Sequence, residues 1–186
     1  LVAAAFGSLP YLLCENPLSP VHALFESRSG FTTTGSTVIP ELGTHPRSIL
    51  FWRNLSQWMG GLGILALLIA LMAALGVNRK SLLGHESSMN LQESPTARIK
   101  GLVTRLWMVY CGMTILCWTG LFGIARLTGE VEMDAFNAFL YTLTAVATGG
   151  FAPHDASVGH FGSAWIEAYL CVFMLLSSLS MVLVVN

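Results

Sequence analysis

The sequence is constrained most by three long stretches that contain no charged residue. Residues 54–78 run for 25 positions without Asp, Glu, Lys or Arg, residues 106–125 for 20 and residues 168–186 for 19. About 20 apolar residues in a helix are enough to cross the hydrocarbon core of a bilayer. The stretches are apolar on every side, whereas a soluble helical bundle shows apolar stripes. They predict membrane-spanning helices, and the uncharged residues 1–14 predict the last part of another.

Composition supports the same class of protein. Of the 186 residues 54% are hydrophobic and 10% are charged, whereas soluble domains carry about 25% charged residues. The mean hydropathy is +0.66. The net charge of −1 argues against a nucleic-acid partner, which would need a basic face. The four cysteines form no CxxC pair and lie in apolar stretches, so we expect neither a disulfide framework nor a transition-metal site.

Two further segments are apolar but too short to span a membrane. Residues 20–40 and 133–153 each contain about ten apolar residues, which are followed by Thr and Gly. Such segments predict re-entrant helices. Non-helical backbone at membrane depth is tolerated only where protein covers it or where it lines a wet cavity.

The two short segments also look like copies of one unit. Residues 25–35 and 139–149 match at Phe, Thr and Gly with a constant offset of 114 residues. The distance from each Gly to the next Trp is 17 residues in the first copy and 16 in the second. Internal repeats of this kind build many transport proteins. We therefore predict a repeated unit of helix, re-entrant helix, Thr-Gly turn and helix.

The turn Thr32-Thr33-Thr34-Gly35 has the chemistry of an ion-selectivity filter. A dehydrated cation needs several oxygen ligands, which an extended stretch supplies from successive backbone carbonyls. Gly allows the positive φ that reverses the chain, and the C-terminal end of the preceding helix attracts a cation. Taken alone, the same letters describe a simple turn between helices. The second copy and the apolar surroundings favour the filter.

The one long polar stretch predicts the orientation in the membrane. Residues 77–101, with Arg105 just beyond, hold five of the nine Lys and Arg residues. By the positive-inside rule this loop is cytoplasmic, so the Thr-Gly turns open to the outside. Acidic residues near the opposite face either form a vestibule that concentrates cations or are ordinary solubilising charges.

Other polar residues in the apolar segments have several interpretations. We expect Glu26 and Arg28 to pair behind the filter, and Arg53 to snorkel to the interface. Gly60, Gly61 and Gly63 predict close packing between helices. The series Ser177–Ser180 either packs against a partner helix or faces a pore.

His154, Asp155 and His160 form the one cluster that could suggest an intramembrane enzyme or a metal site. A metal site needs more ligands in a defined geometry, and a catalytic site needs converging groups. We favour hydrogen bonds within an outer loop.

Three stretches carry a resemblance to a known family. Residues 29–36 read SGFTTTGS, residues 49–64 read ILFWRNLSQWMGGLGI and residues 147–159 read ATGGFAPHDASVG. With them the sequence resembles the Trk/Ktr/HKT superfamily of potassium transporters, and most closely the bacterial TrkH-type membrane subunit. The resemblance runs over almost the whole chain.

The resemblance implies an all-α membrane protein of the inner membrane, built from helix–re-entrant pore helix–helix (M1-P-M2) repeats. In the family, four such repeats surround one pore for K⁺, and the subunits form homodimers on cytoplasmic nucleotide-binding regulatory subunits. Residues 1–76 would be the second repeat with an incomplete first helix, residues 77–101 a cytoplasmic loop and residues 102–186 the third repeat with a truncated last helix. The resemblance implies no enzymatic activity and no cofactor.

Carried over by position, the filter residues that would bind K⁺ through backbone carbonyls form two groups of four. They are Thr32, Thr33, Thr34 and Gly35 in the first segment, and Val146, Ala147, Thr148 and Gly149 in the second.

The sequence departs from the family in two ways. Two filter segments cannot encircle an ion that four surround, so the remaining pore repeats would have to complete the pore. The family also breaks the last helix of the third repeat with a Gly-containing gating loop, whereas residues 177–186 contain no Gly. A truncated, non-conducting assembly subunit and a Na⁺-permeable member therefore remain as alternatives to K⁺ uptake.

Overall fold

The computed structural model describes residues 2–74 and 95–185, and within these ranges the regular structure is entirely helical. Two of the nine helices are 3₁₀ helices. In chain order the helices are α1 (Val2–Gly7), α2 (Leu9–Leu13), α3 (Pro20–Phe31), η1 (Leu42–Thr44), α4 (Arg47–Ala74), α5 (Pro95–Thr128), α6 (Ala135–Ala147), η2 (Ser157–Phe161) and α7 (Ala164–Val185). Most of the loop predicted for residues 77–101 lies outside the described residues. Its last residues, 95–101, are the first residues of α5, which begins at Pro95.

The predicted spans correspond to the long helices α4, α5 and α7. Within α5, the segment Val103–Thr128 is long and apolar enough to cross a membrane. Shorter apolar helices cover Val2–Leu13, Ala135–Ala147 and Ala164–Leu179. The first of these is interrupted at Ser8, whose hydroxyl donates to the carbonyl of Ala5 over 2.7 Å, and Pro10 follows at the start of α2. Pro lacks the N–H that would continue a helical ladder.

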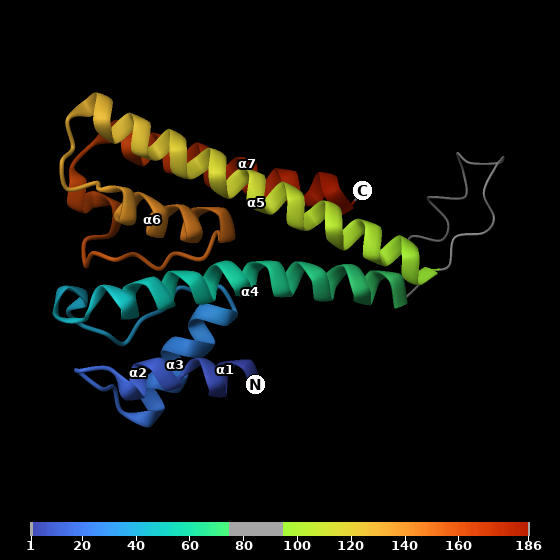
Figure 1. Ribbon diagram of the computed structural model, residues 1–186, viewed down its shortest axis with the longest axis horizontal. Coiled ribbons are helices and arrows are strands. Elements are labelled where there is room, and N and C mark those ends of the chain that lie inside the picture. The colour runs from blue at the N-terminus through green and yellow to red at the C-terminus, as the bar shows by residue number, and fades with distance from the viewer. Residues whose placement is uncertain (1, 75–94, 186) are drawn as a thin grey trace.

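The short helices α3 and α6 have the re-entrant course that the sequence predicts. In Figure 1 each enters from one end of the molecule and stops near its middle, and the chain then returns without regular helix to the same end. The next long helix, α4 or α7, starts there. Between α3 and α6 lies α4, which packs against both. This course places the ends of the two short helices near the middle of the long axis of the molecule.

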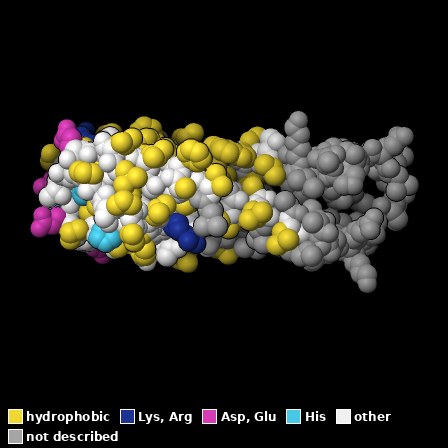
Figure 2. Space-filling model, turned by 90° about the horizontal axis from the view of Figure 1, so that it is seen from below, with side chains coloured by type: hydrophobic (Ala, Val, Ile, Leu, Met, Phe, Trp, Pro, Cys, Tyr) yellow, Lys and Arg dark blue, Asp and Glu magenta, His cyan; other side chains and the backbone are white. Residues whose placement is uncertain are grey.

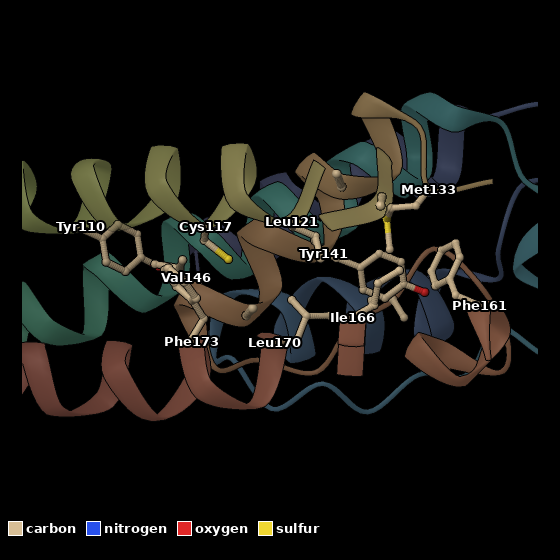
Figure 3. Packing of buried hydrophobic residues seen from close by; sticks show 14 of the residues in the cluster. Tyr110, Cys117, Leu121, Met133, Tyr141, Val146, Phe161, Ile166, Leu170 and Phe173 are labelled. Atoms are coloured by element: carbon tan, nitrogen blue, oxygen red, sulfur yellow. The ribbon is translucent and has the colours of Figure 1, made fainter. Parts of the chain in front are cut away.

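The largest hydrophobic cluster joins α5, α6 and α7. Figure 3 shows Leu121 of α5, Tyr141 of α6 and Ile166 of α7 directed toward one another. Nine of the 13 residues of α6 are buried, whereas α3 exposes Val21, with 74% of its surface accessible, on one side. The greater burial makes α6 the more firmly held of the two short helices.

The surface divides by chemistry along the long axis. Figure 2 shows apolar side chains spread over the flank and acidic side chains gathered at one end of the described part. That end is the one to which the chain returns after α3 and α6. An apolar flank next to a charged end is the pattern expected of helices that cross a bilayer.

Candidate functional site: two filter segments and the polar network behind them

The short helices α3 and α6 end with the same backbone hydrogen bonds. At the end of α3, the N–H of Thr33 donates to the carbonyl of Gly30 over 2.9 Å, and that of Thr34 to Ser29 over 3.0 Å. At the end of α6, the N–H of Thr148 donates to Ala145 over 3.1 Å, and that of Gly149 to Thr144 over 3.0 Å. The two helices therefore stop in the same way, and the stretches that follow them start in the same direction relative to the helix.

Backbone dihedrals extend this correspondence. Thr33 and Thr148 have φ of +53° and +51°, and Gly35 and Gly150 have φ of +77° and +94°. A positive φ at a β-branched residue is a true outlier that costs energy. It occurs at equivalent places in both segments, where the chain leaves the helix. Strain that recurs in this way is a mark of a functional turn.

The two copies are therefore related by 115 residues, and the offset of 114 taken from the sequence is wrong by one. Matching Thr-Gly with Thr-Gly aligned Gly35 with Gly149. The geometry instead aligns Thr33-Thr34-Gly35 with Thr148-Gly149-Gly150. The second copy has two consecutive glycines, Gly149 and Gly150, so that a comparison of residue types alone aligned Gly35 with the first of them.

The starts of α3 and α6 confirm the new register. Ser19 is the N-cap of α3, and its side chain accepts a hydrogen bond from the N–H of His22 over 3.3 Å. Asp134, which lies 115 residues later, caps α6 by accepting from the N–H of Asn137 over 2.7 Å. Side-chain oxygens at this position satisfy N–H groups that have no partner within the helix.

The first predicted filter segment is a compact turn with mostly exposed hydroxyls. Thr32 ends α3, and its hydroxyl donates to the carbonyl of Arg28 and lies 2.7 Å from the hydroxyl of Thr34. The hydroxyl of Thr33 donates to the carbonyl of Thr32 over 2.8 Å. Gly35 follows at positive φ. The four residues predicted from the sequence therefore lie together.

The second predicted segment lies one residue earlier than its structural counterpart. Val146 and Ala147 are still in α6, and Val146 is buried in the cluster of Figure 3. Thr148 is exposed, Gly149 is buried and Gly150 is exposed. The counterpart of Gly35 is thus Gly150, which the sequence reasoning missed. A comparison of Thr-x-Gly with Thr-x-Gly would have found it.

The two segments touch each other through glycine backbone. A Cβ added to Gly35 would lie 2.0 Å from the carbonyl oxygen of Gly149 and 3.3 Å from the Cα of Gly150. No side chain fits there, so the close approach requires glycine in addition to the positive φ. Segments far apart in the sequence are thereby brought to one place, with the C-terminal ends of α3 and α6 beside them. Helix ends of this kind carry partial negative charge that favours a cation.

A buried ion pair lies behind the first segment. The guanidinium Nε of Arg53 lies 3.3 Å from Glu26 Oε2, and the side chains are 1% and 0% exposed. Glu26 Oε1 also accepts from the hydroxyl of Thr37 and, over 2.6 Å, from the N–H of Val38, just after the filter turn. The expected pairing partner was therefore wrong, because Glu26 pairs with Arg53 while Arg28 is exposed.

Arg53 is also placed differently from the expectation that it snorkels. It is buried, donates to the carbonyl of Ala152 over 3.1 Å and lies 4.2 Å from the ring centroid of Phe151. Burial of the charge is compensated by the carboxylate of Glu26 and this carbonyl. One side chain of α4 thus contacts α3 through Glu26 and the stretch that follows the second filter segment through Phe151 and Ala152.

Two amides on the same helix hold the second segment. The side chain of Asn54 donates to the carbonyls of Leu140 and Phe151 over 3.0 and 3.3 Å. Gln57 Oε1 accepts from the hydroxyl of Thr144 over 2.7 Å and from the N–H of Phe151 over 3.1 Å. Sequence reasoning missed both amides. Their signal was two polar side chains inside an otherwise apolar span, which is a functional hint by itself.

A cavity of about 220 Å³ lies at the ends of α3 and α6. Thr33 and Thr148 line it from the filter segments, Gly61 from α4, and Ser177 and Ser178 from α7. Ser177 is 1% exposed. Ser177 and Ser178 thus border this cavity, while α7 continues as a helix through them.

In the loop after α6 and in η2, His154 and Asp155 make hydrogen bonds, as favoured from the sequence, and His160 makes an ion pair. His154 Nδ1 lies 3.2 Å from the hydroxyl of Tyr141, and the rings of His154 and His160 stack with centroids 4.1 Å apart. His160 pairs with Glu132 over 3.0 Å, and Asp155 accepts from the N–H of Leu42. Among the described residues no group of three or more His, Cys, Asp or Glu could hold a metal ion. Burial, followed by the neighbouring His160, lowers the pKa of His154.

Known proteins share this arrangement. A family model described as a cation transport protein, TrkH, matches residues 2–186. The chain belongs to the TrkH family. The Trk system potassium uptake protein TrkH of Halomonas elongata is 40% identical over 181 residues, which are 96% of this chain and 36% of that protein. TrkH of Escherichia coli K12 is 37% identical over 178 residues.

The crystal structure of the potassium transporter TrkH from Vibrio parahaemolyticus resembles this TrkH-family chain with a TM-score of 0.75 and 37% sequence identity. The match covers 94% of this chain and 33% of that one. The predicted fold class, an all-α membrane protein of M1-P-M2 repeats, is thereby confirmed. The chain spans about a third of the length of the curated relatives named above.

Proposed function

We propose that this chain supplies two of the filter segments of a potassium uptake transporter. The observation that carries the proposal is the meeting of two strained turns at Gly35 and Gly149, each at the end of a re-entrant helix. Such turns present backbone oxygens and helix C-termini to one axis, which suits a monovalent cation that has to bind and then leave. The TrkH relatives are named as potassium uptake proteins.

The remaining parts of the pore come from further repeats of a full-length chain. Two segments leave part of the coordination shell of an ion open, and α3 exposes Val21, Leu24 and Phe25 on one side. Homodimer formation and a cytoplasmic nucleotide-binding regulatory subunit are further proposals that come from the family resemblance. So are residence in the bacterial inner membrane, with residues 77–101 inside and the filter mouths outside, and the absence of a catalytic role or a bound cofactor.

A chimera tests the proposed function. Residues 2–186 replace the corresponding segment of the Escherichia coli relative, and the chimera is expressed in a strain that lacks its own potassium uptake systems. Rescue of growth at low K⁺ and rubidium uptake are expected. A chimera that reaches the membrane in folded form but takes up neither ion would contradict the proposal and favour the non-conducting assembly subunit. Uptake of Na⁺ in preference to K⁺ would favour the Na⁺-permeable alternative.

A further inference from the structure

The side chain of Gln57 belongs to α4, yet its contacts are with the re-entrant helix and filter segment of the following unit. It is 0% exposed. Its carbonyl oxygen Oε1 accepts two hydrogen bonds, from the hydroxyl of Thr144 and from the N–H of Phe151. Because a backbone N–H can only donate, the oxygen of the amide has to face Phe151, which fixes the orientation of the amide.

The amide of Gln57 lies next to Gly149, the glycine whose backbone approaches Gly35 in the first segment. A Cβ added to Gly149 would lie 2.4 Å from Gln57 Oε1. The carbonyl oxygen of Gly149 approaches Gly35. The backbone of Gly149 therefore lies between Gln57 on one side and Gly35 on the other. Any shift of the Gln57 amide is therefore transmitted to the gap between the two segments.

We propose that Gln57 is a positioning residue that sets ion selectivity. It holds the second filter segment at a fixed distance from the first. The proposal rests on the proposed function and deepens it, because it names the group outside the filter that determines the geometry of the filter. The chemistry it requires is an acceptor oxygen for the N–H of Phe151. A buried N–H without an acceptor is costly, so the loop would move to find another partner.

Three variants of the chimera separate this role from general stability. Gln57→Leu removes the acceptor at similar size. Gln57→Glu keeps an oxygen acceptor, because a carboxyl group at this buried position is favoured in its neutral form. It loses no hydrogen bond of the parent, since Nε2 has no partner among the described residues. Thr114→Val is the matched control. It removes the acceptor of another, partly buried side-chain hydrogen bond of α4, which Trp58 Nε1 donates over 3.0 Å to the hydroxyl of Thr114 in α5.

The expected result is a selective change in one variant. Gln57→Leu lowers the preference for K⁺ over Na⁺ by about tenfold, the size expected when a buried donor loses its acceptor, while the amount of folded protein remains. Gln57→Glu restores most of the preference, and Thr114→Val keeps it. Unchanged selectivity in Gln57→Leu would overturn the inference, and so would an equal loss in Thr114→Val or no recovery in Gln57→Glu.

A second measurement does not depend on transport. Hydrogen–deuterium exchange of the peptide that contains residues 149–153 is expected to become faster in Gln57→Leu than in the parent and in Thr114→Val. Equal exchange in all three proteins would overturn the inference. Failure of the parent chimera to transport K⁺ contradicts the proposed function alone, since the exchange measurement still decides the role of Gln57.

Discussion

At the scale of single residues, the charge pair of Glu26 and Arg53 is the most demanding feature of the site. Both side chains are almost fully removed from solvent. Removing one partner of such a pair leaves an uncompensated buried charge, whereas removing both leaves a neutral site. The exposed pair of Arg47 and Asp134, 3.7 Å apart, provides a contrast because its charges remain hydrated.

The changes in stability caused by substituting the two residues of this pair should therefore not be additive. Arg53→Met is expected to destabilise the chimera by about 3–5 kcal/mol, and the double variant Glu26→Gln with Arg53→Met by less. Arg47→Gln serves as the exposed control with little change. Thermal unfolding of the purified proteins, followed by size-exclusion fluorescence, measures these differences. A double variant that is less stable than Arg53→Met alone would contradict the account.

Gly35 supports a second prediction at this scale. Gly35→Ser is expected to lower the preference for K⁺ over Na⁺ by about tenfold, which corresponds to about 1.4 kcal/mol between the two ions. The reason is the steric conflict of a Cβ with the carbonyl of Gly149, added to a positive φ. Competition between rubidium and sodium uptake measures the preference. The control is Gly43→Ser in η1, where an added Cβ meets nothing within 4 Å; equal effects of the two variants would refute the assignment.

The residue scale also shows where sequence reasoning stops. The Thr-Gly turns could be predicted because their chemistry is local and depends on residues that are neighbours in the chain. The partner of Glu26 could not, because Arg28 and Arg53 are both basic and only the packing of α4 against α3 decides between them. Gln57 was missed for a related reason. Its role depends on Phe151, 94 residues away.

At the scale of elements, α3 and α6 share the same start and end, but their N-terminal caps differ in hydrogen-bond length. Both begin with a capped first turn and end in the same hydrogen-bonded turn. Their caps differ, because Asp134 accepts over 2.7 Å and Ser19 over 3.3 Å. The lengths of the apolar runs predicted both helices. The offset between the two copies could be found only from the backbone geometry, because one extra glycine shifts an alignment that is based on residue types alone.

The cap of α6 gives a prediction for this element. Asp134→Ala is expected to destabilise the protein by about 1 kcal/mol, because the N–H of Asn137 loses its acceptor. Asp134→Asn keeps a side-chain oxygen at the same place and should be closer to the parent. Ser19→Ala is expected to cost less, in line with the longer bond. Thermal unfolding ranks the three variants, and a loss in Asp134→Asn as large as in Asp134→Ala would show that charge, not capping, matters.

The outer turn at η2 gives an element-scale prediction about pH. Because the pKa of His154 is lowered in the folded protein, the unfolded state binds the proton more strongly. The stability of this turn is therefore full above the unfolded-state pKa of about 6.5 and falls as the pH drops below it. The stacked ring of His160 adds repulsion once both imidazoles are charged, while three nearby acids oppose the shift: Glu132, Asp134 and Asp155.

Hydrogen–deuterium exchange over residues 154–161 at pH 7.5 and pH 5.5 measures the loosening of this turn. Intrinsic exchange is corrected by the same peptide after unfolding. His154→Phe keeps a ring next to His160 but cannot take up a proton, so its exchange should change less with pH than that of the parent. An equal pH dependence in parent and variant would exclude His154 as the titrating group.

At the scale of the whole molecule, the two proposed filter segments lie where two units of the fold meet. Helix α4 belongs to the first unit, and its side chains Arg53, Asn54 and Gln57 contact α6 and residues 151–152 of the second. Each unit is therefore incomplete without its neighbour. In the proposed full-length transporter, a helix of a further repeat would cover the exposed side of α3 in the way that α4 packs against α6.

Orientation in the membrane is the prediction that belongs to this scale. The basic stretch 77–101 predicts a cytoplasmic loop, and the acidic end seen in Figure 2 is the end to which the chain returns after α3 and α6. Cysteines introduced as Ser88→Cys and Ala156→Cys, in a chimera freed of its other cysteines, are treated with a membrane-impermeant maleimide. In intact spheroplasts Ala156→Cys should react and Ser88→Cys should react only after permeabilisation. Equal labelling of both in detergent serves as the control, because it shows that each thiol is reactive. The reverse pattern in spheroplasts would invert the molecule, place the filter mouths in the cytoplasm and contradict uptake through an outward-facing filter.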